Sequence, residues 1–307
     1  MFERFSWSGV LAASALILSA SPLAAQRATG DVPAFSARVV GSGTPIILIP
    51  GLTNDGRVWD ATVAELSKTH ECHVLSLAGF GGTPPVTVDS LWLDTMRDAV
   101  IRYVRERKLD KPVLIGHSLG GFLALDIAAT APDLPSRVIN VDGLPFMGGI
   151  MMQEMTVEQM RPMAARMRTM MQRATPEQSA AAFEQNLRTM VRDSSAMPLL
   201  RVMGRASDPR TVGEAMYALY VTDLRPKLAQ ITVPVLNLHA WAAYKPMGQT
   251  RARLDSALAR QYAALRTGTT RVTDTGYHFI MFDEPAWFLT QLREALGSPG
   301  RATRARQ

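Results

Sequence analysis

The stretch Val113-Leu114-Ile115-Gly116-His117-Ser118-Leu119-Gly120-Gly121 decides the fold of this chain. An apolar, β-branched run ends at Gly-His-Ser-Leu-Gly, and an Ala- and Leu-rich helical pattern follows from Gly121 to Thr130. A strand, a sharp turn and a helix in this order lift the serine hydroxyl above the end of a sheet, beside a helix N-terminus. The pattern therefore predicts that Ser118 is a nucleophile. A chance match to Gly-x-Ser-x-Gly is the alternative.

Apolar strand-like runs alternate with helical patterns on both sides of this stretch. Such alternation is typical of an α/β fold with a mostly parallel central sheet that is flanked by helices. We expect strands over residues 34–40, 45–49, 72–77, 113–117, 137–141, 231–238 and 270–274. We expect helices over residues 58–67, 90–107, 121–130, 250–265 and 285–296.

Residues 143–224 interrupt this alternation with a helical segment that holds 13 of the 17 methionines. A capping box, Thr175-Pro176-Glu177-Gln178, predicts a helix start, whereas Pro162 should kink or restart a helix. This segment carries a stripe of methionines at helical spacing: Met160, Met163, Met167, Met170 and Met171. Such a stripe fits either a buried helix face or an adaptable pocket lining, and we favour a lid over the site that these residues would line. We expect residues 26–142 and 225–298 to form the core and 143–224 a helical cap.

The two ends of the chain have the composition of segments outside this core. Arg4, an apolar run over Val10–Ala20 and small residues up to Ala25 are typical of a signal peptide over residues 1–25. This pattern predicts a periplasmic or secreted protein with no membrane span in its mature form; an uncut N-terminal anchor is the alternative. Residues 299–307 are expected to be a disordered tail.

The composition argues against several other classes of protein. The net charge is +6, but no basic block with interleaved aromatic residues indicates a nucleic-acid partner. The single cysteine, Cys72, cannot form an internal disulfide and is expected to be buried in a strand. One cysteine and five histidines do not suggest a metal site, and the sequence gives no indication of an oligomeric state.

A serine hydroxyl is a poor nucleophile at neutral pH and needs a base within hydrogen-bonding reach. His278 is the strongest candidate, because it follows the last predicted strand on a loop at the end of the sheet where open α/β folds place their chemistry. His239 ends the preceding strand and is a weaker alternative. The His117 side chain should point away from Ser118.

The chain resembles the α/β-hydrolase fold family over nearly all of its predicted mature length. The resemblance rests on four motifs: Gly116–Gly121 as nucleophile elbow, Pro50-Gly51-Leu52 as oxyanion loop, the glycine-rich turn at residues 79–82, and Gly276–Phe279 as histidine loop. It implies a serine, a histidine and an acid as catalytic residues, with no metal and no cofactor. The backbone N–H groups of Leu52 and Leu119 would hold the oxyanion.

The acid needs a separate argument, because no Asp or Glu lies between Leu224 and Leu254, where many relatives carry it. Asp142 instead ends the strand after the nucleophile helix, and neighbouring strands lie about 4.8 Å apart. We therefore predict Asp142 as the acid. A turn-capping role for Asp142, or Asp274 as the acid, are the alternatives.

The sequence therefore predicts an exported serine hydrolase that cleaves small carboxylic esters with apolar groups. A lactonase or a carbon–carbon bond hydrolase with the same triad, and a non-catalytic binding protein that retains the fold, are the other hypotheses. Candidate pocket residues, each equally suited to plain packing, are Asn54, Trp59, Met160, Met163, Trp241 and Tyr244.

Overall fold

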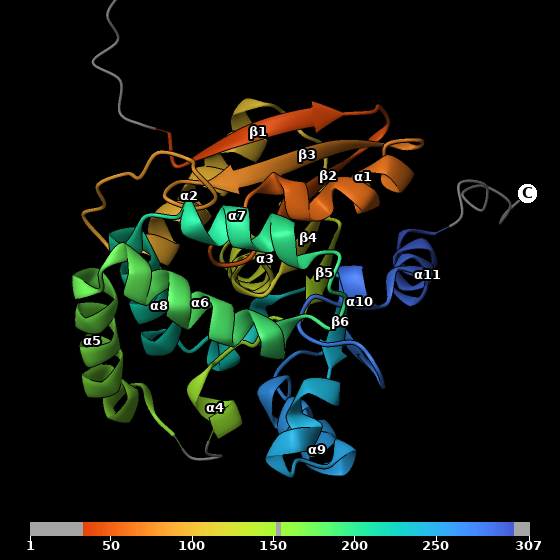
Figure 1. Cartoon of the computed structure of the whole chain (residues 1–307). Helices are drawn as coiled ribbons and strands as arrows, with labels where there is room; N and C mark the ends of the chain where they lie inside the picture. Colours follow the sequence, from red (N-terminus) through yellow and green to blue (C-terminus); the bar gives the residue numbers. More distant parts are fainter. Residues whose placement is uncertain (1–32, 152–154, 298–307) are drawn as a thin grey trace, which may run out of the picture. The chain divides into compact units, whose positions relative to one another are not determined.

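The computed structural model describes residues 33–151 and 155–297, so the predicted signal peptide and C-terminal tail lie outside the described residues. A seven-stranded sheet in the order β1-β3-β2-β4-β5-β6-β7 forms the centre (Figure 1). Only β1 runs antiparallel to its neighbour, which confirms the predicted, mostly parallel sheet. The strands are β1 (Phe35–Val40), β2 (Thr44–Ile49), β3 (His70–Leu77), β4 (Val113–His117), β5 (Arg137–Val141), β6 (Val235–Ala240) and β7 (Gly268–Thr273).

Helices cover both faces of the sheet. One face packs against α2, α3 and α9, and the other against α1 and α11, through two clusters of buried apolar side chains. The helices that accompany the sheet are η1 (Gly56–Trp59), α1 (Asp60–Leu66), α2 (Trp92–Glu106), α3 (Leu119–Thr130), η2 (Arg225–Gln230), η3 (Ala242–Met247), α9 (Arg251–Gln261), α10 (Ile280–Asp283) and α11 (Pro285–Leu296). Cys72 is fully buried in β3, as predicted.

The start of β6 differs from the sequence expectation. We expected a strand from Ile231, but β6 begins at Val235 and is preceded by the short 3-10 helix η2. Pro234 has no N–H to donate to a neighbouring strand, so the ladder starts after it. The predicted helix at 250–265 likewise ends earlier, at Gln261.

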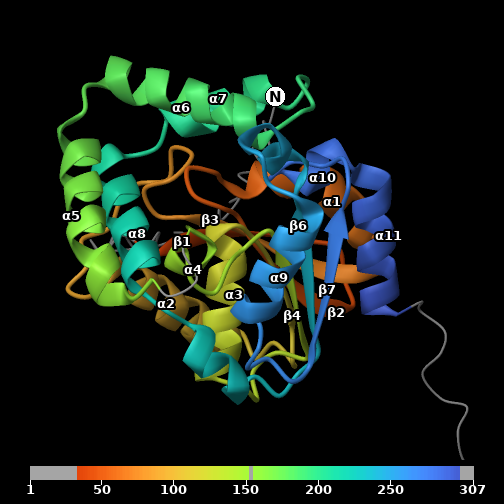
Figure 2. The same ribbon diagram turned by 90° about the horizontal axis from the view of Figure 1, so that it is seen from below.

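The segment between β5 and β6 contains α4 (Gly148–Met151), α5 (Val157–Arg173), α6 (Pro176–Met190), α7 (Met197–Arg205) and α8 (Pro209–Val221). The Thr175 capping box forms and starts α6 as predicted. The predicted restart at Pro162 is wrong, because α5 continues through it while packing along α8. Proline costs this helix one backbone hydrogen bond, which tertiary packing compensates. Figure 2 shows α6 and α7 across the end of the sheet toward which β7 points.

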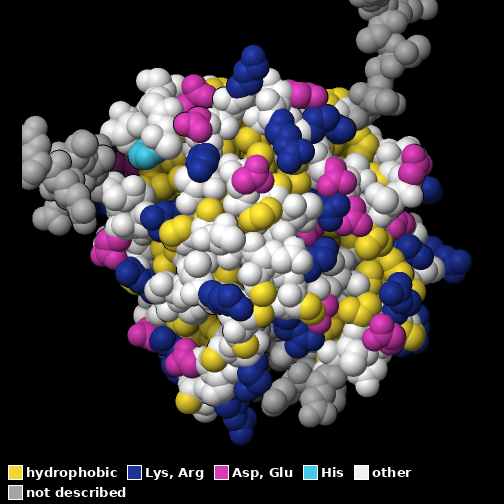
Figure 3. Space-filling model, turned by 180° about the vertical axis from the view of Figure 1, so that it is seen from behind, with side chains coloured by type: hydrophobic (Ala, Val, Ile, Leu, Met, Phe, Trp, Pro, Cys, Tyr) yellow, Lys and Arg dark blue, Asp and Glu magenta, His cyan; other side chains and the backbone are white. Residues whose placement is uncertain are grey.

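Charged side chains of both signs share the surface. On the face shown in Figure 3, Lys and Arg side chains lie interspersed with Asp and Glu rather than in one basic block. Arg38, for example, pairs with Asp60, and Arg271 pairs with Glu294. Among the described residues, no helix combines the length and apolar character that a membrane crossing requires.

Candidate active site

Ser118 occupies the single residue between β4 and α3. Its φ of 54° lies in the left-handed region, which a non-glycine residue adopts only at a cost in strain. A Cβ atom on Gly116 would lie 2.0 Å from the Gly120 carbonyl oxygen, and one on Gly120 would lie 2.3 Å from the Ile49 carbonyl oxygen. The two glycines therefore permit a turn that leaves Ser118 partly exposed between buried neighbours. Helix α3 begins at Leu119, two residues before the predicted start.

The strand register places Asp142 beside this turn. His117 pairs with Val141 across β4 and β5, so Ser118 and Asp142 are the next residues on neighbouring strands. Asp142 also has a left-handed backbone, with a φ of 53°, and donates its N–H to the Leu238 carbonyl oxygen at 2.7 Å. The turn thus holds the Asp142 carboxylate at the end of the sheet where Ser118 lies.

His278 approaches Asp142 from the loop after β7. Its Nδ1 lies 2.7 Å from Asp142 Oδ2, and its side chain is 23% exposed. No partner in the described part of the chain occupies His278 Nε2, and the Ser118 hydroxyl and the His278 ring are not hydrogen-bonded to one another there. Catalytic contacts of this kind often tighten only when substrate binds.

Asp274, the alternative acid, lies elsewhere. It is exposed and accepts hydrogen bonds from Trp241 Nε1 at 3.0 Å and Arg251 at 2.7 Å. No contact joins it to His278 among the described residues. Of these two carboxylates, Asp142 is the one that is hydrogen-bonded to the His278 ring.

The environment of Asp142 favours its ionised form. Burial by itself would raise the pKa of the carboxyl, but hydrogen bonds from His239 and His278 outweigh burial and hold the pKa well below its usual value. The backbone N–H of Ala240 adds a third donor, at 3.1 Å from Oδ1. The carboxylate therefore stays charged throughout the neutral range.

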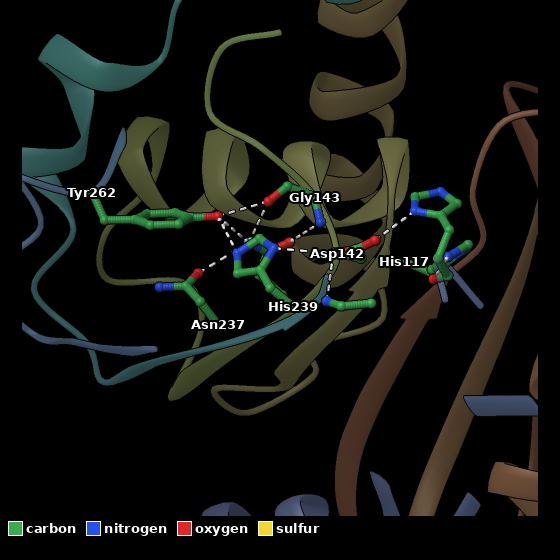
Figure 4. Close-up of polar contacts among 9 residues, drawn as sticks. His117, Asp142, Gly143, Asn237, His239 and Tyr262 are labelled. Atoms are coloured by element: carbon green, nitrogen blue, oxygen red, sulfur yellow. Dashed lines mark hydrogen bonds and ion pairs between the residues drawn. The ribbon is translucent and has the colours of Figure 1, made fainter. Parts of the chain in front are cut away.

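His239 belongs to a buried polar network rather than acting as a free base. Its Nδ1 lies 3.1 Å from Asp142 Oδ1 and its Nε2 lies 3.0 Å from the Tyr262 hydroxyl, so both ring nitrogens are occupied (Figure 4). Asn140 and Asn237 extend the network beneath Tyr262. Asn140, Asn237 and His239 are buried polar residues on otherwise apolar strands. They were the sequence signal for this network, and our sequence interpretation missed it.

The side chain of His117, which we expected to point away from Ser118, contacts the histidine loop. Its Nε2 lies 3.0 Å from the His278 carbonyl oxygen, and its ring is tilted against the rings of both His278 and Phe279, with ring centres 4.7 Å apart in each pair. Burial, followed by the charge of His278, lowers the pKa of His117 to about 3, so the ring is neutral. A neutral His117 donates from Nε2 and anchors the backbone that carries His278.

Two backbone N–H groups point to an oxyanion site. Neither Leu52 nor Leu119 donates its N–H to another group in the described part of the chain. Leu119 opens α3, so its N–H is one of the free donors of a helix N-terminus. Thr53, next to Leu52, has a φ of 62°, which marks a tight turn in this loop.

The structure corrects part of the predicted pocket. Trp59 is fully buried, stacked on Phe288 beneath His117, and Met160 is 1% exposed. Both are packing residues because neither presents surface to a substrate. Asn54 is 3% exposed and donates from Nδ2 to the Leu52 carbonyl oxygen, which supports the oxyanion loop from within.

The other three pocket candidates keep some exposure. Met163 is half-buried on α5. Trp241 is half-buried and held by Asp274 and by Lys245, whose Nζ lies 4.3 Å from the centre of the indole ring. Tyr244 is half-buried, and burial, followed by the charge of Asp142, raises its pKa. The arrangement uses side chains and backbone only, and the described residues contain no cluster of metal ligands.

Comparisons with known proteins identify the family of this chain. Residues 46–291 match the sequence profile of the alpha/beta hydrolase family. The chain is 25% identical, over 65% of its length and 74% of the relative's, to a pimeloyl-[acyl-carrier protein] methyl ester esterase of Aliivibrio salmonicida. A second such esterase, from Nitrosomonas europaea, is 26% identical over 65% of this chain and 77% of its own.

Solved structures share the fold at lower sequence identity. The enol-lactonase from Burkholderia xenovorans superposes with a TM-score of 0.68 and 20% identity, covering 85% of this chain and 96% of its own. A thermophilic esterase from Thermogutta terrifontis gives a TM-score of 0.67 and 20% identity, and the superposition covers 85% of this chain and 92% of the esterase. With the family profile matched over most of its length, the chain belongs to the alpha/beta hydrolase family and is a hydrolase.

Proposed function

We propose that the protein is a serine hydrolase that cleaves carboxylic esters with apolar groups, using Ser118, His278 and Asp142 as its triad. The observation that carries the proposal is the 2.7 Å contact between His278 and Asp142, at the end of the strand next to the strained Ser118 turn. A buried acid, an oriented imidazole and an exposed hydroxyl are the parts that acyl transfer through serine requires.

The reaction proceeds in two halves. His278 Nε2 takes the Ser118 proton as the hydroxyl oxygen attacks the ester carbonyl carbon, and Asp142 stabilises the resulting imidazolium. The N–H groups of Leu52 and Leu119 hold the negative oxygen; one such donor is worth about 3–4 kcal/mol of the barrier. The alcohol then leaves with the proton from His278, and water releases the acyl group from Ser118 by the same steps.

The proposed substrate class rests on two supports. The relatives named as methyl ester esterases are consistent with an oxygen ester, and the half-buried Trp241, which follows the Ala240 that bonds Asp142, offers apolar surface near the acid. A lactone would use the same triad and the same steps. The substrate tests must therefore separate open-chain esters from cyclic ones.

Hydrolysis of nitrophenyl esters with acyl chains of increasing length, beside a panel of lactones, tests this proposal. We expect turnover of the open-chain esters by the wild-type protein and a background rate in Ser118→Ala. Ser256→Ala, which removes an exposed hydroxyl on α9 that bonds the Ala252 carbonyl oxygen, is the matched control and should retain most of the activity. Lactone opening without ester turnover would overturn the choice of substrate.

The proposal includes export of the protein. It rests on the sequence pattern of residues 1–25, with Arg4 before an apolar run and small residues up to Ala25. N-terminal sequencing of the protein from cell fractions tests it. A mature chain that begins after Ala25, in the periplasm or the medium, supports export, whereas an intact Met1 in the cytoplasm contradicts it.

A further inference from the structure

The hydrogen-bond network behind Asp142 fixes the positions of its protons. Tyr262 has one hydroxyl hydrogen and three polar neighbours: the Gly143 carbonyl oxygen at 2.7 Å, Asn140 Nδ2 at 2.9 Å and His239 Nε2 at 3.0 Å. Asn140 Nδ2 can only donate and the Gly143 carbonyl can only accept. At 2.7 Å a hydrogen must lie between the Tyr262 and Gly143 oxygens, and only Tyr262 can supply it.

This assignment places a hydrogen on His239 Nε2. Because the Tyr262 hydrogen is directed at Gly143, its oxygen must accept from His239 Nε2 across the 3.0 Å contact. The orientation of Asn140 is fixed separately, since its Oδ1 accepts the Gly143 N–H at 3.1 Å. Asn140 Nδ2 is therefore a donor in this network and cannot take the Tyr262 hydrogen.

The opposite edge of the His239 ring also needs a hydrogen. Nδ1 lies 3.1 Å from Asp142 Oδ1, an ionised carboxylate oxygen that already accepts the Ala240 N–H. If His239 Nδ1 carried no hydrogen, its lone pair would face the negatively charged Asp142 Oδ1 and the two atoms would repel one another. A His239 ring with hydrogens on both nitrogens is an imidazolium, and a buried cation of this kind is tolerated when it is paired with a carboxylate and fully hydrogen-bonded.

We infer that His239 is a buried imidazolium that positions Asp142 and balances its charge, so that His278 faces an acid already paired with a cation. This inference rests on the proposed triad. Each oxygen of Asp142 then has its own partners. Oδ1 accepts hydrogen bonds from His239 and Ala240, and Oδ2 accepts one from His278. His239 is thus a positioning residue that acts through Asp142 and does not touch the substrate.

The positive charge of His239 also affects the protonation of His278, the base of the proposed triad. A proton on His278 is stabilised by the negative charge of Asp142 and opposed by the positive charge of His239. Within residues 33–151 and 155–297, the titratable groups in contact with His239 are Asp142 and Tyr262. Asp142 in turn contacts His278, whose ring centre lies 4.7 Å from that of the neutral His117, and the charge of Asp142 also acts on Tyr244. Removing the cation should therefore make His278 take up its proton at higher pH.

Two substitutions separate the charge of His239 from its positioning role. Tyr262→Phe removes the acceptor for Nε2–H, so His239 becomes neutral while Nδ1–H still holds Asp142. His239→Gln removes both the charge and the ring. We expect the acidic limb of the kcat/KM profile to move to higher pH by about one unit in both variants. We expect kcat at the optimum to fall about tenfold or more only in His239→Gln.

Tyr103→Phe is the matched control. Tyr103 forms a hydrogen bond of 2.8 Å with His73, a tyrosine–histidine pair between α2 and β3 that lies outside the site. It should leave the pH profile unchanged. This control distinguishes loss of charge beside Asp142 from general loosening of the fold.

Nitrogen-15 NMR of the ring nitrogens provides a readout that does not depend on activity. At pH 7 the wild-type protein should show hydrogens on both nitrogens of His239, and Tyr262→Phe should lose the one on Nε2. A singly protonated His239 in the wild type, or an acidic limb that stays in place in both variants, would overturn the inference. Failure of the proposed function would instead appear as absent ester turnover in the wild type, whatever the NMR result.

Discussion

Replacing Asp142 by asparagine should disable His278 by reversing the positions of its hydrogens. Oδ1 of Asp142 accepts from both His239 Nδ1 and the Ala240 N–H, so the asparagine carbonyl oxygen must take this place. The amide NH₂ then replaces Oδ2, at 2.7 Å from His278 Nδ1. His278 must present a lone pair there and carry its hydrogen on Nε2, the nitrogen that acts as the base in the proposed mechanism.

A base protonated on the wrong nitrogen loses most of its catalytic power. We expect kcat/KM for a nitrophenyl ester to fall by about 10⁴-fold in Asp142→Asn, or about 5.5 kcal/mol of transition-state stabilisation. Asp274→Asn is the matched control, because that carboxylate is exposed and bonds Trp241 and Arg251 instead. Its activity should stay within about threefold of the wild type.

The assay is initial-rate ester hydrolysis at pH 7 to 8, with urea unfolding to confirm that both variants fold. A folded Asp142→Asn protein within tenfold of wild-type activity would refute this reasoning. So would an equal loss in Asp274→Asn, because the acid would then have been wrongly identified.

Three further predictions concern buried polar groups. Burial raises the pKa of the Cys72 thiol to about 11, so a disulfide reagent at pH 8 should modify Cys72 only after urea unfolds the chain, and fast labelling of the native protein would contradict this. Burial lowers the pKa of His117 from 6.5 to about 3 in the native protein. As the pH falls below 6.5, His117 therefore takes up a proton in the unfolded chain but not in the native protein. Between pH 7 and 5 the wild type should therefore lose about 2 kcal/mol more of its unfolding free energy than His117→Gln, measured by urea titration; equal losses would contradict the prediction. The Asp283 carboxylate accepts the backbone N–H groups of Arg192, Asp193 and Tyr277, so Asp283→Asn should cost about 1.5–3 kcal/mol in urea unfolding, and an unchanged midpoint would exclude such a role.

The sequence predicted those features that short-range patterns determine. The Ser118 turn, the order of strands and helices and the capping box at Thr175 each follow from a few neighbouring residues. The choice of Asp142 over Asp274 used only the rule that adjacent parallel strands end together; the structure places Asp142 Oδ2 2.7 Å from His278 Nδ1, and the role of the acid stays a prediction. Local chemistry and sheet topology were sufficient at these positions.

Features that depend on contacts across the fold could not be predicted. The register that pairs Val141 with Leu238 sets His239 beside Asp142, and no local pattern contains that pairing. Trp59 looked like a pocket residue because it follows the oxyanion loop, but Phe288, far away in the chain, buries it. Pro162 remains inside α5 because packing along α8 outweighs the helix-breaking tendency of proline.

Mapping the site of a covalent fluorophosphonate adduct by mass spectrometry tests the central claim most directly. The probe bonds only to a serine oxygen that a neighbouring base activates, so it reports on the triad without an assumed substrate. We expect one adduct, on Ser118, absent in Ser118→Ala and formed much more slowly in His278→Ala. Labelling of another serine, or none by a folded wild-type protein, would contradict it.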